Sequence, residues 1–155
     1  MQSLHPRVRV LWVLTALVTA SVLAGALAGI GLAVDDAPVP VYAPVVVGIV
    51  LGGAGVLHAI ARFDRWRYEI QSDSLYLERG VITEVATAVP FVRVQHVDTQ
   101  RGPIARLLGI ASVVVYTAGS RGADVTVPGL TPDRAEALRN RLRELAIESE
   151  PDDGV

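Results

Sequence analysis

The sequence of 155 residues contains no cysteine, which excludes disulfide bonds, thiolate nucleophiles and metal sites with cysteine ligands. Lysine is also absent, so all 14 basic residues are arginine. The formal net charge of −2 argues against a nucleic-acid-binding protein. Apolar residues, in contrast, make up 51% of the chain, and the mean hydropathy is +0.42. They are concentrated near the N-terminus, as is typical of a membrane protein.

Two apolar segments are each long enough to cross a lipid bilayer. Residues 10–34 include no charged side chain, and residues 39–61 are interrupted only by two prolines near the start and by His58. About 20 apolar residues suffice to span a hydrocarbon core of roughly 30 Å. Residues 35–38 form the polar connection, so the sequence predicts a helical hairpin with an external turn. A cleaved signal peptide is the alternative for the first segment, although its apolar core is normally only about 7–15 residues long.

The charges around these segments predict their orientation. Five arginines flank the two segments: Arg7, Arg9, Arg62, Arg65 and Arg67. The only charged side chains of the connecting turn are acidic, at Asp35 and Asp36. Short flanks rich in arginine stay in the cytoplasm. We therefore expect a multi-pass protein of the cell membrane with both termini in the cytoplasm, residues 1–9 forming the N-terminal one.

Small residues recur at intervals of four within both segments: Ser21, Gly25 and Gly29 in the first, Gly48 and Gly52 in the second. This spacing places them on one helix face, where small side chains permit close helix packing. The two helices of one hairpin could pack on each other in this way. Homodimerisation through the same faces is the second interpretation.

From Tyr68 onward the apolar period changes to two, which predicts β-strands. The strands are expected at residues 68–70, 75–78, 81–89, 92–97, 110–117 and 124–127. Turns are expected at Ser72-Asp73, Arg79-Gly80 and residues 118–122. A break in the alternation near Gln95 and His96 predicts a β-bulge.

Two helices are expected in this region. Pro103 and Gly109 bracket a short one at residues 104–108. Thr131, followed by proline and aspartate, begins a longer amphipathic helix that ends near Ile147. The acidic residues 148–155 are expected to be disordered. Six or seven strands and a C-terminal helix predict a small barrel or bent sheet, with a two-layer α+β sandwich as the alternative.

Several short motifs together carry a family resemblance. They are Arg67-Tyr68-Glu69-Ile70, Leu75 to Gly80, Val89-Pro90, Arg93-Val94-Gln95, residues 100–103, residues 106–109, Thr117-Ala118-Gly119 and Pro128-Gly129-Leu130. With the preceding hairpin, this set resembles the bacterial pleckstrin-homology domains of the YdbS-like, membrane-flanked type. The resemblance implies a two-helix transmembrane hairpin followed by a mainly-β pleckstrin-homology-like barrel with a C-terminal α-helix, the domain covering residues 66–147.

The sequence offers few candidates for chemistry. His5, His58 and His96 lack the spacing of metal ligands, and no nucleophile or phosphate-binding motif is present, so we expect neither an enzyme nor a cofactor or metal. His96 and Asp98 could share one side of a strand, where a pair that faces solvent or is satisfied by the bulge is expected rather than an acid–base dyad.

The cationic side chains Arg93, Arg101 and Arg106 are the candidate contacts for lipid headgroups or a partner. Two functions follow from them. The first is a membrane-anchored adaptor that binds another membrane protein, for example a larger relative of the same family, or a second copy. The alternative is a module that binds anionic lipid headgroups at the inner membrane surface.

Overall fold

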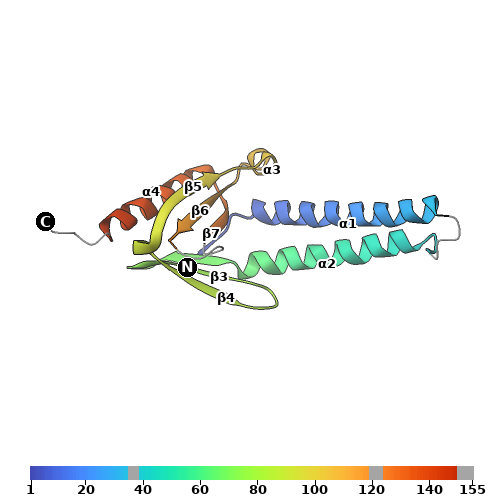
Figure 1. Cartoon of the computed structure of the whole chain (residues 1–155), viewed down its shortest axis with the longest axis horizontal. Coiled ribbons are helices and arrows are strands. Elements are labelled where there is room, and N and C mark those ends of the chain that lie inside the picture. Colours follow the sequence, from blue (N-terminus) through green and yellow to red (C-terminus); the bar gives the residue numbers. More distant parts are fainter. Residues whose placement is uncertain (35–38, 119–123, 150–155) are drawn as a thin grey trace. The chain divides into compact units, whose positions relative to one another are not determined.

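The computed structural model describes residues 1–34, 39–118 and 124–149, which form two compact units. One is helical and comprises Arg9–Asp64. The other is mainly β and comprises Met1–Val8 together with the residues from Arg65 onward. Figure 1 shows the elements of each unit.

The helical unit contains α1 (Arg7–Ala33) and α2 (Ala43–Arg65). Both helices are long and apolar enough to cross a membrane, and only 6% and 11% of their most apolar windows are buried. This exposure differs from that of core helices in soluble proteins, which bury an apolar face. The predicted external turn at residues 35–38 lies outside the described residues.

Both helices extend beyond the predicted limits at the ends that adjoin the mainly-β unit. α1 begins three residues before the predicted start, at Arg7, and α2 continues four residues past the predicted end, to Arg65. Arginine is a good helix former, so the helices extend beyond the apolar residues that marked the predicted limits. α2 begins four residues late, at Ala43, and its Pro44 lies in the first turn, where no backbone N–H is needed.

The described residues of the mainly-β unit form seven strands in two antiparallel sheets. One sheet has the order β1-β2-β3-β4 and the other β5-β6-β7. The strands are β1 (Gln2–Ser3), β2 (Arg67–Ile70), β3 (Ser74–Arg79), β4 (Val85–Pro90), β5 (Val94–Gln100), β6 (Ala111–Thr117) and β7 (Val125–Leu130). No pairing between the described strands closes the two sheets into a barrel. The pleckstrin-homology-like fold predicted from the sequence is confirmed in this two-sheet form.

Three predicted strand boundaries are wrong. The predicted strand at residues 81–89 begins only at Val85, because Gly80 adopts a φ of +114° and turns the chain. Val92 lies in the short 3-10 helix η1 (Phe91–Arg93) rather than in a strand. The strand predicted at residues 124–127 ends later than expected, because Pro128, Gly129 and Leu130 belong to β7; Gly129 has a φ of +63°, and the pairing with β6 shifts there. The predicted bulge is confirmed by the register shift between Val94 and His96.

The N-terminal residues form part of this unit, whereas the sequence pattern placed residues 1–9 outside the domain. β1 pairs with β2. Leu4 and Val8 are 3% and 1% exposed, and the backbone N–H of His5 donates to the carbonyl of Gly129. The segment Met1–Val8 therefore contacts both sheets. A strand of two residues has too little alternation to be recognised in sequence.

The C-terminal helix α4 (Pro132–Glu148) begins as predicted, with the Thr131 hydroxyl accepting a hydrogen bond from the Arg134 N–H. It packs on β5, β6 and η1. Its buried face consists of Ala135, Leu138, Leu142 and Leu145. The largest fully buried side chains of the unit are Val8, Leu75, Leu77, Phe91, Ile110, Val113, Val115, Val127, Leu130 and Leu142. The short predicted helix is also present, as α3 (Pro103–Leu107).

Candidate functional site

A cleft of about 650 Å³ lies between β5 and the C-terminal half of α4. On the strand side it is lined by Val94, Gln95, His96, Val97 and Asp98, and on the helix side by Arg139, Arg143, Ala146 and Ile147. The helix residues are spaced at intervals of four, three and one, so they share one face. This face borders the buried stripe that packs on the sheet.

The strand contributes five consecutive residues to the cleft. Beyond the bulge between Val94 and His96, successive side chains of a strand point to opposite faces of the sheet, so one face alone would supply only every second residue. The consecutive run from His96 to Asp98 therefore indicates that the cleft runs along the backbone edge of β5. β5 is the outer strand of its sheet and pairs only with β6 among the described strands. Alternate N–H and C=O groups along such an edge lack a strand partner.

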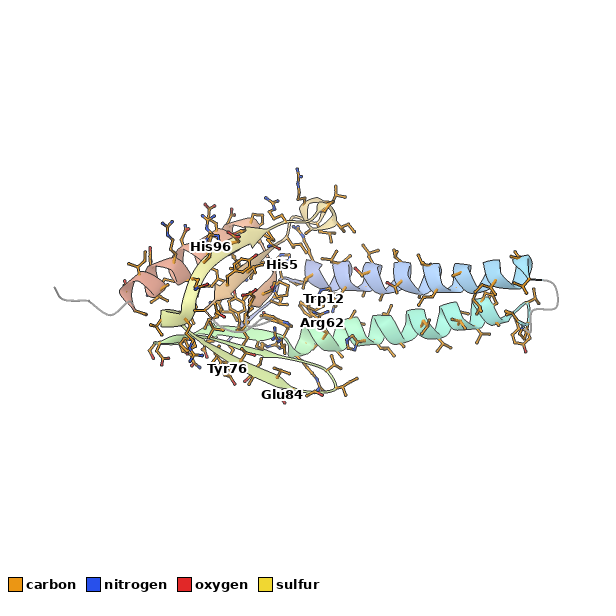
Figure 2. All side chains as sticks on the ribbon, viewed as in Figure 1. His5, Trp12, Arg62, Tyr76, Glu84 and His96 are labelled. Carbon is orange, nitrogen blue, oxygen red and sulfur yellow. The ribbon has the colours of Figure 1, made fainter. Side chains whose placement is uncertain are left out.

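The side chains on β5 include a close polar pair. His96 Nε2 lies 2.7 Å from Asp98 Oδ1, as expected for residues two apart on a strand. The His96 ring also lies 6.0 Å from the ring of Tyr116, its partner across the sheet on β6. Figure 2 labels His96 on β5. The His96 and Asp98 side chains are 66% and 46% exposed, so this is a solvent-facing pair.

The helix side of the cleft is cationic. Arg139 makes a weak ion pair with Glu136 at 3.5 Å, one turn away. Arg143 is exposed, and its side chain has no hydrogen bond or ion pair to a described residue. Because Asp98 is engaged by His96, the cleft offers two guanidinium groups opposite a strand edge, with the apolar side chain of Ile147, 61% exposed, beside them. This site was not predicted from the sequence, since it is formed by segments forty residues apart.

The three arginines that the sequence suggested as candidates do not form one cluster. Arg93 precedes β5 and Arg101 follows it, so a strand of seven residues, roughly 25 Å at the usual rise, separates them. Arg106 lies in the last turn of α3, close in sequence to Arg101. The described residues hold no group of three or more His, Asp or Glu side chains that could bind a metal.

The arginines flanking the helices make specific contacts. Within the helical unit, the Arg62 guanidinium lies 4.2 Å from the ring centroid of Trp12 (Figure 2). The Arg9 guanidinium lies 5.7 Å from the ring centroid of Phe63. Each helix thus places one arginine over an aromatic ring of the other. The sequence assigned these arginines to topology and to the membrane interface. Trp12 was overlooked, although an aromatic ring beside a cationic flank is a usual feature of membrane interfaces.

Within the mainly-β unit, three further arginines hydrogen-bond backbone carbonyls. Arg7 Nη1 donates to Leu108 at 3.3 Å, Arg65 Nη1 donates to Val81 at 2.8 Å, and Arg67 Nη1 donates to Trp66 at 2.9 Å.

The small residues of the two helices differ in surroundings. A methyl group on Gly48 would lie 3.3 Å from Ala24, and one on Gly52 would lie 3.5 Å from Leu17, so both glycines face α1. Gly25 and Gly29 have no such neighbour within 4 Å, and Ser21 is exposed. Among the described glycines of the hairpin, Gly55 lies closest to its neighbour: a methyl group on it would lie 2.8 Å from the Ala16 side chain.

A family model described as a bacterial PH domain matches residues 10–146 of the chain. The chain belongs to this family. The match begins within α1, so it includes both apolar helices as well as most of the mainly-β unit, and it confirms the resemblance on which the predicted fold rested. The two antiparallel sheets and the C-terminal helix described above are consistent with this family's PH-like fold.

The chain is also similar to the UPF0699 transmembrane protein YdbS of Bacillus subtilis (strain 168). The two are 33% identical over 87 residues, which cover 56% of this chain and 53% of the relative. The chain thus spans about half the length of the curated relative it matches. No solved structure matches the chain. The comparisons and the two apolar helices together identify a membrane-associated module with a PH-like domain.

Proposed function

We propose that this bacterial PH domain is a membrane-anchored adaptor, and that its cleft between β5 and α4 binds an extended, acidic segment of another membrane protein. The observation that carries the proposal is the run of five consecutive β5 residues along the cleft. An extended segment would add a strand to this edge through main-chain hydrogen bonds. Its acidic side chains would meet Arg139 and Arg143.

The proposed anchor consists of α1 and α2, each crossing the cell membrane once, with both termini and the PH-like domain on the cytoplasmic side. The five flanking arginines support this orientation, since positively charged flanks are retained in the cytoplasm. Use of α1 as a cleaved signal peptide is disfavoured, because cleavage would remove β1, Leu4 and Val8 from the domain.

An adaptor accounts for the architecture better than headgroup recognition does. Two spanning helices already hold the domain at the membrane, so weak lipid affinity would add no localisation. The cleft, in contrast, combines an open strand edge, cationic side chains and an exposed apolar residue, which are features of peptide-binding grooves. We propose no catalytic role.

The test is a selection of peptides from a random displayed library against the full chain in lipid nanodiscs. We expect the selected peptides to alternate acidic or polar residues with apolar ones, because a strand presents alternate side chains to each face. Arg143→Glu should abolish binding of these peptides. Arg141→Glu is the matched control: it reverses the same charge on the same helix, but Arg141 pairs with Glu144 and lies outside the cleft.

Two outcomes would contradict the proposal. Peptides that bind the Arg143→Glu and Arg141→Glu variants equally well would place the site elsewhere. Peptides that still bind when each alternate backbone N–H is methylated would exclude strand addition, because methylation removes the main-chain donors on which it depends.

A further inference from the structure

Two short segments of the PH-like domain carry the most exposed large apolar side chains of its described residues. In the turn between β3 and β4, Ile82 is 94% exposed. On α3, Leu107 is 87% exposed and Ile104 is 51% exposed. None of them contributes to the core, and a fully exposed apolar side chain is unfavourable in water. The fold of the domain itself therefore gives no reason for apolar residues at these positions.

Each segment accepts a hydrogen bond from an arginine at the junction between the domain and one of its apolar helices. Arg7, the first residue of α1, donates to the carbonyl of Leu108 at the end of α3. Arg65, the last residue of α2, donates to the carbonyl of Val81, beside Ile82. At each junction between the domain and an apolar helix, one arginine side chain thus contacts one of the two segments.

Two arginines at α3 fit a charged surface: Arg101 lies just before the helix, and Arg106 lies in its last turn. Both are exposed, and neither side chain has a hydrogen bond or ion pair to a described residue. Apolar side chains surrounded by arginine are typical of protein surfaces that lie in the interface of an anionic bilayer. The β3–β4 turn also carries Glu84, so α3 supplies the cationic part of this surface.

We propose that α3 and the β3–β4 turn form a membrane-contacting end of the domain. Ile82, Ile104 and Leu107 enter the headgroup region of the bilayer, while Arg101 and Arg106 meet lipid phosphates. The occupant is a lipid surface rather than a protein because the chain enters apolar, membrane-length helices directly beside both segments.

The consequence is a fixed orientation of the domain. Figure 1 shows α3 and the β3–β4 turn at one end of the mainly-β unit, and the C-terminal end of α4 at the other. The membrane-contacting end therefore leaves the cleft between β5 and α4 open to the cytoplasm. The inference concerns a different surface from the cleft, so either proposal can fail without the other.

The absence of cysteine makes a direct test possible, because a single introduced thiol is the only labelling site. Leu107→Cys, Ile82→Cys and the control Ile147→Cys would each be spin-labelled in the full chain, in nanodiscs with and without anionic lipid. All three positions are exposed, so the fold should tolerate the substitutions. We expect labels at positions 107 and 82 to be accessible to oxygen and several-fold less accessible to a water-soluble nickel reagent than the label at position 147.

Charge reversal at Arg101 and Arg106 tests whether lipid phosphates hold this end of the domain at the bilayer. Arg101→Glu with Arg106→Glu should raise nickel accessibility at position 107 in anionic nanodiscs, whereas Arg141→Glu should leave it unchanged. Equal nickel accessibility at positions 107, 82 and 147 would overturn the proposal. Shielding from both oxygen and nickel would also overturn it, because that pattern indicates a protein contact.

Discussion

Val8 packs against Gly129 so closely that a methyl group on Gly129 would lie 2.7 Å from Cγ1 and 2.8 Å from Cγ2 of Val8. Val8 precedes the apolar part of α1, and Gly129 lies in β7, more than a hundred residues later. The PH-like domain is therefore assembled from segments on both sides of the helical hairpin. A fragment that begins after α2 lacks β1 and two buried core residues.

Gly129→Ala is expected to destabilise the domain strongly. The φ of +63° costs a side chain about 1–2 kcal/mol. The clash with Val8 adds about 1–3 kcal/mol. Thermal unfolding of the full chain in detergent measures the change in unfolding midpoint. It is followed by tryptophan fluorescence, to which the buried Trp66 contributes. Gly102→Ala is the control, since that position is open and has a φ of −68°, and it should leave the midpoint nearly unchanged.

Leu4→Ala tests whether the N-terminal segment belongs to the core. Leu4 is 3% exposed, so we expect a loss of about 2–4 kcal/mol in the free energy of unfolding. Leu107→Ala removes the same atoms from a side chain that is 87% exposed, and its unfolding should stay within about 0.5 kcal/mol of the parent. Equal effects of the two substitutions would show that the segment is not packed as described.

The contact between Arg62 and Trp12 can be measured by a double-mutant cycle. With the guanidinium 4.2 Å from the ring centroid, Arg62→Gln and Trp12→Leu should be coupled by about 0.5–2 kcal/mol. The looser pair of Arg9 and Phe63, at 5.7 Å, should show a smaller coupling. Unfolding of the hairpin in detergent supplies both values, and additive effects for Arg62 and Trp12 would argue against the contact.

Tyr68 gives the domain a pH dependence at high pH. Burial raises the pKa of its hydroxyl above the ordinary value of about 10, and the nearby Arg134 opposes this in part. Between the ordinary and the raised pKa the folded chain binds more protons than the unfolded chain, so stability falls as pH rises through this window. Tyr68→Phe should remove this component of the fall.

The same substitution deletes the hydrogen bond from Tyr68 to Gln2, 2.8 Å long, at a cost of about 1 kcal/mol at neutral pH. Unfolding midpoints measured at neutral pH and above pH 10 give both effects. An unchanged slope in Tyr68→Phe would assign the high-pH loss to other groups.

The parts of the fold that were predicted correctly depend on interactions between residues that are close in sequence. Thr131 with the following proline begins α4 because its hydroxyl satisfies a free backbone N–H, and that interaction depends on neighbours in sequence. Leu75 and Leu77 alternate with polar residues, and both are fully buried. The same rule failed at residues 81–84, where strand-forming residues follow Gly80 but its conformation turns the chain.

Features made by distant segments could not be predicted from local patterns. Gln2 and Ser3 form a strand only because β2, more than sixty residues later, offers its edge. Arg143 lines the cleft together with β5, and the sequence of α4 contains no signal that β5 lies beside it. The candidate arginines were chosen by their charge and, for Arg101 and Arg106, by their place beside the short helix at Pro103. The strand between Arg93 and Arg101 separates Arg93 from the other two.

The most direct test of the proposed binding site is backbone amide hydrogen exchange of the full chain in nanodiscs, with and without a peptide selected for the cleft. Strand addition predicts slower exchange at alternate residues of β5, Val94–Gln100, on binding, because every second N–H faces the cleft. β4, Val85–Pro90, which is also an outer strand, should be unaffected. Protection confined to α4, or none at β5, would contradict the proposal that this edge is where the protein holds its partner.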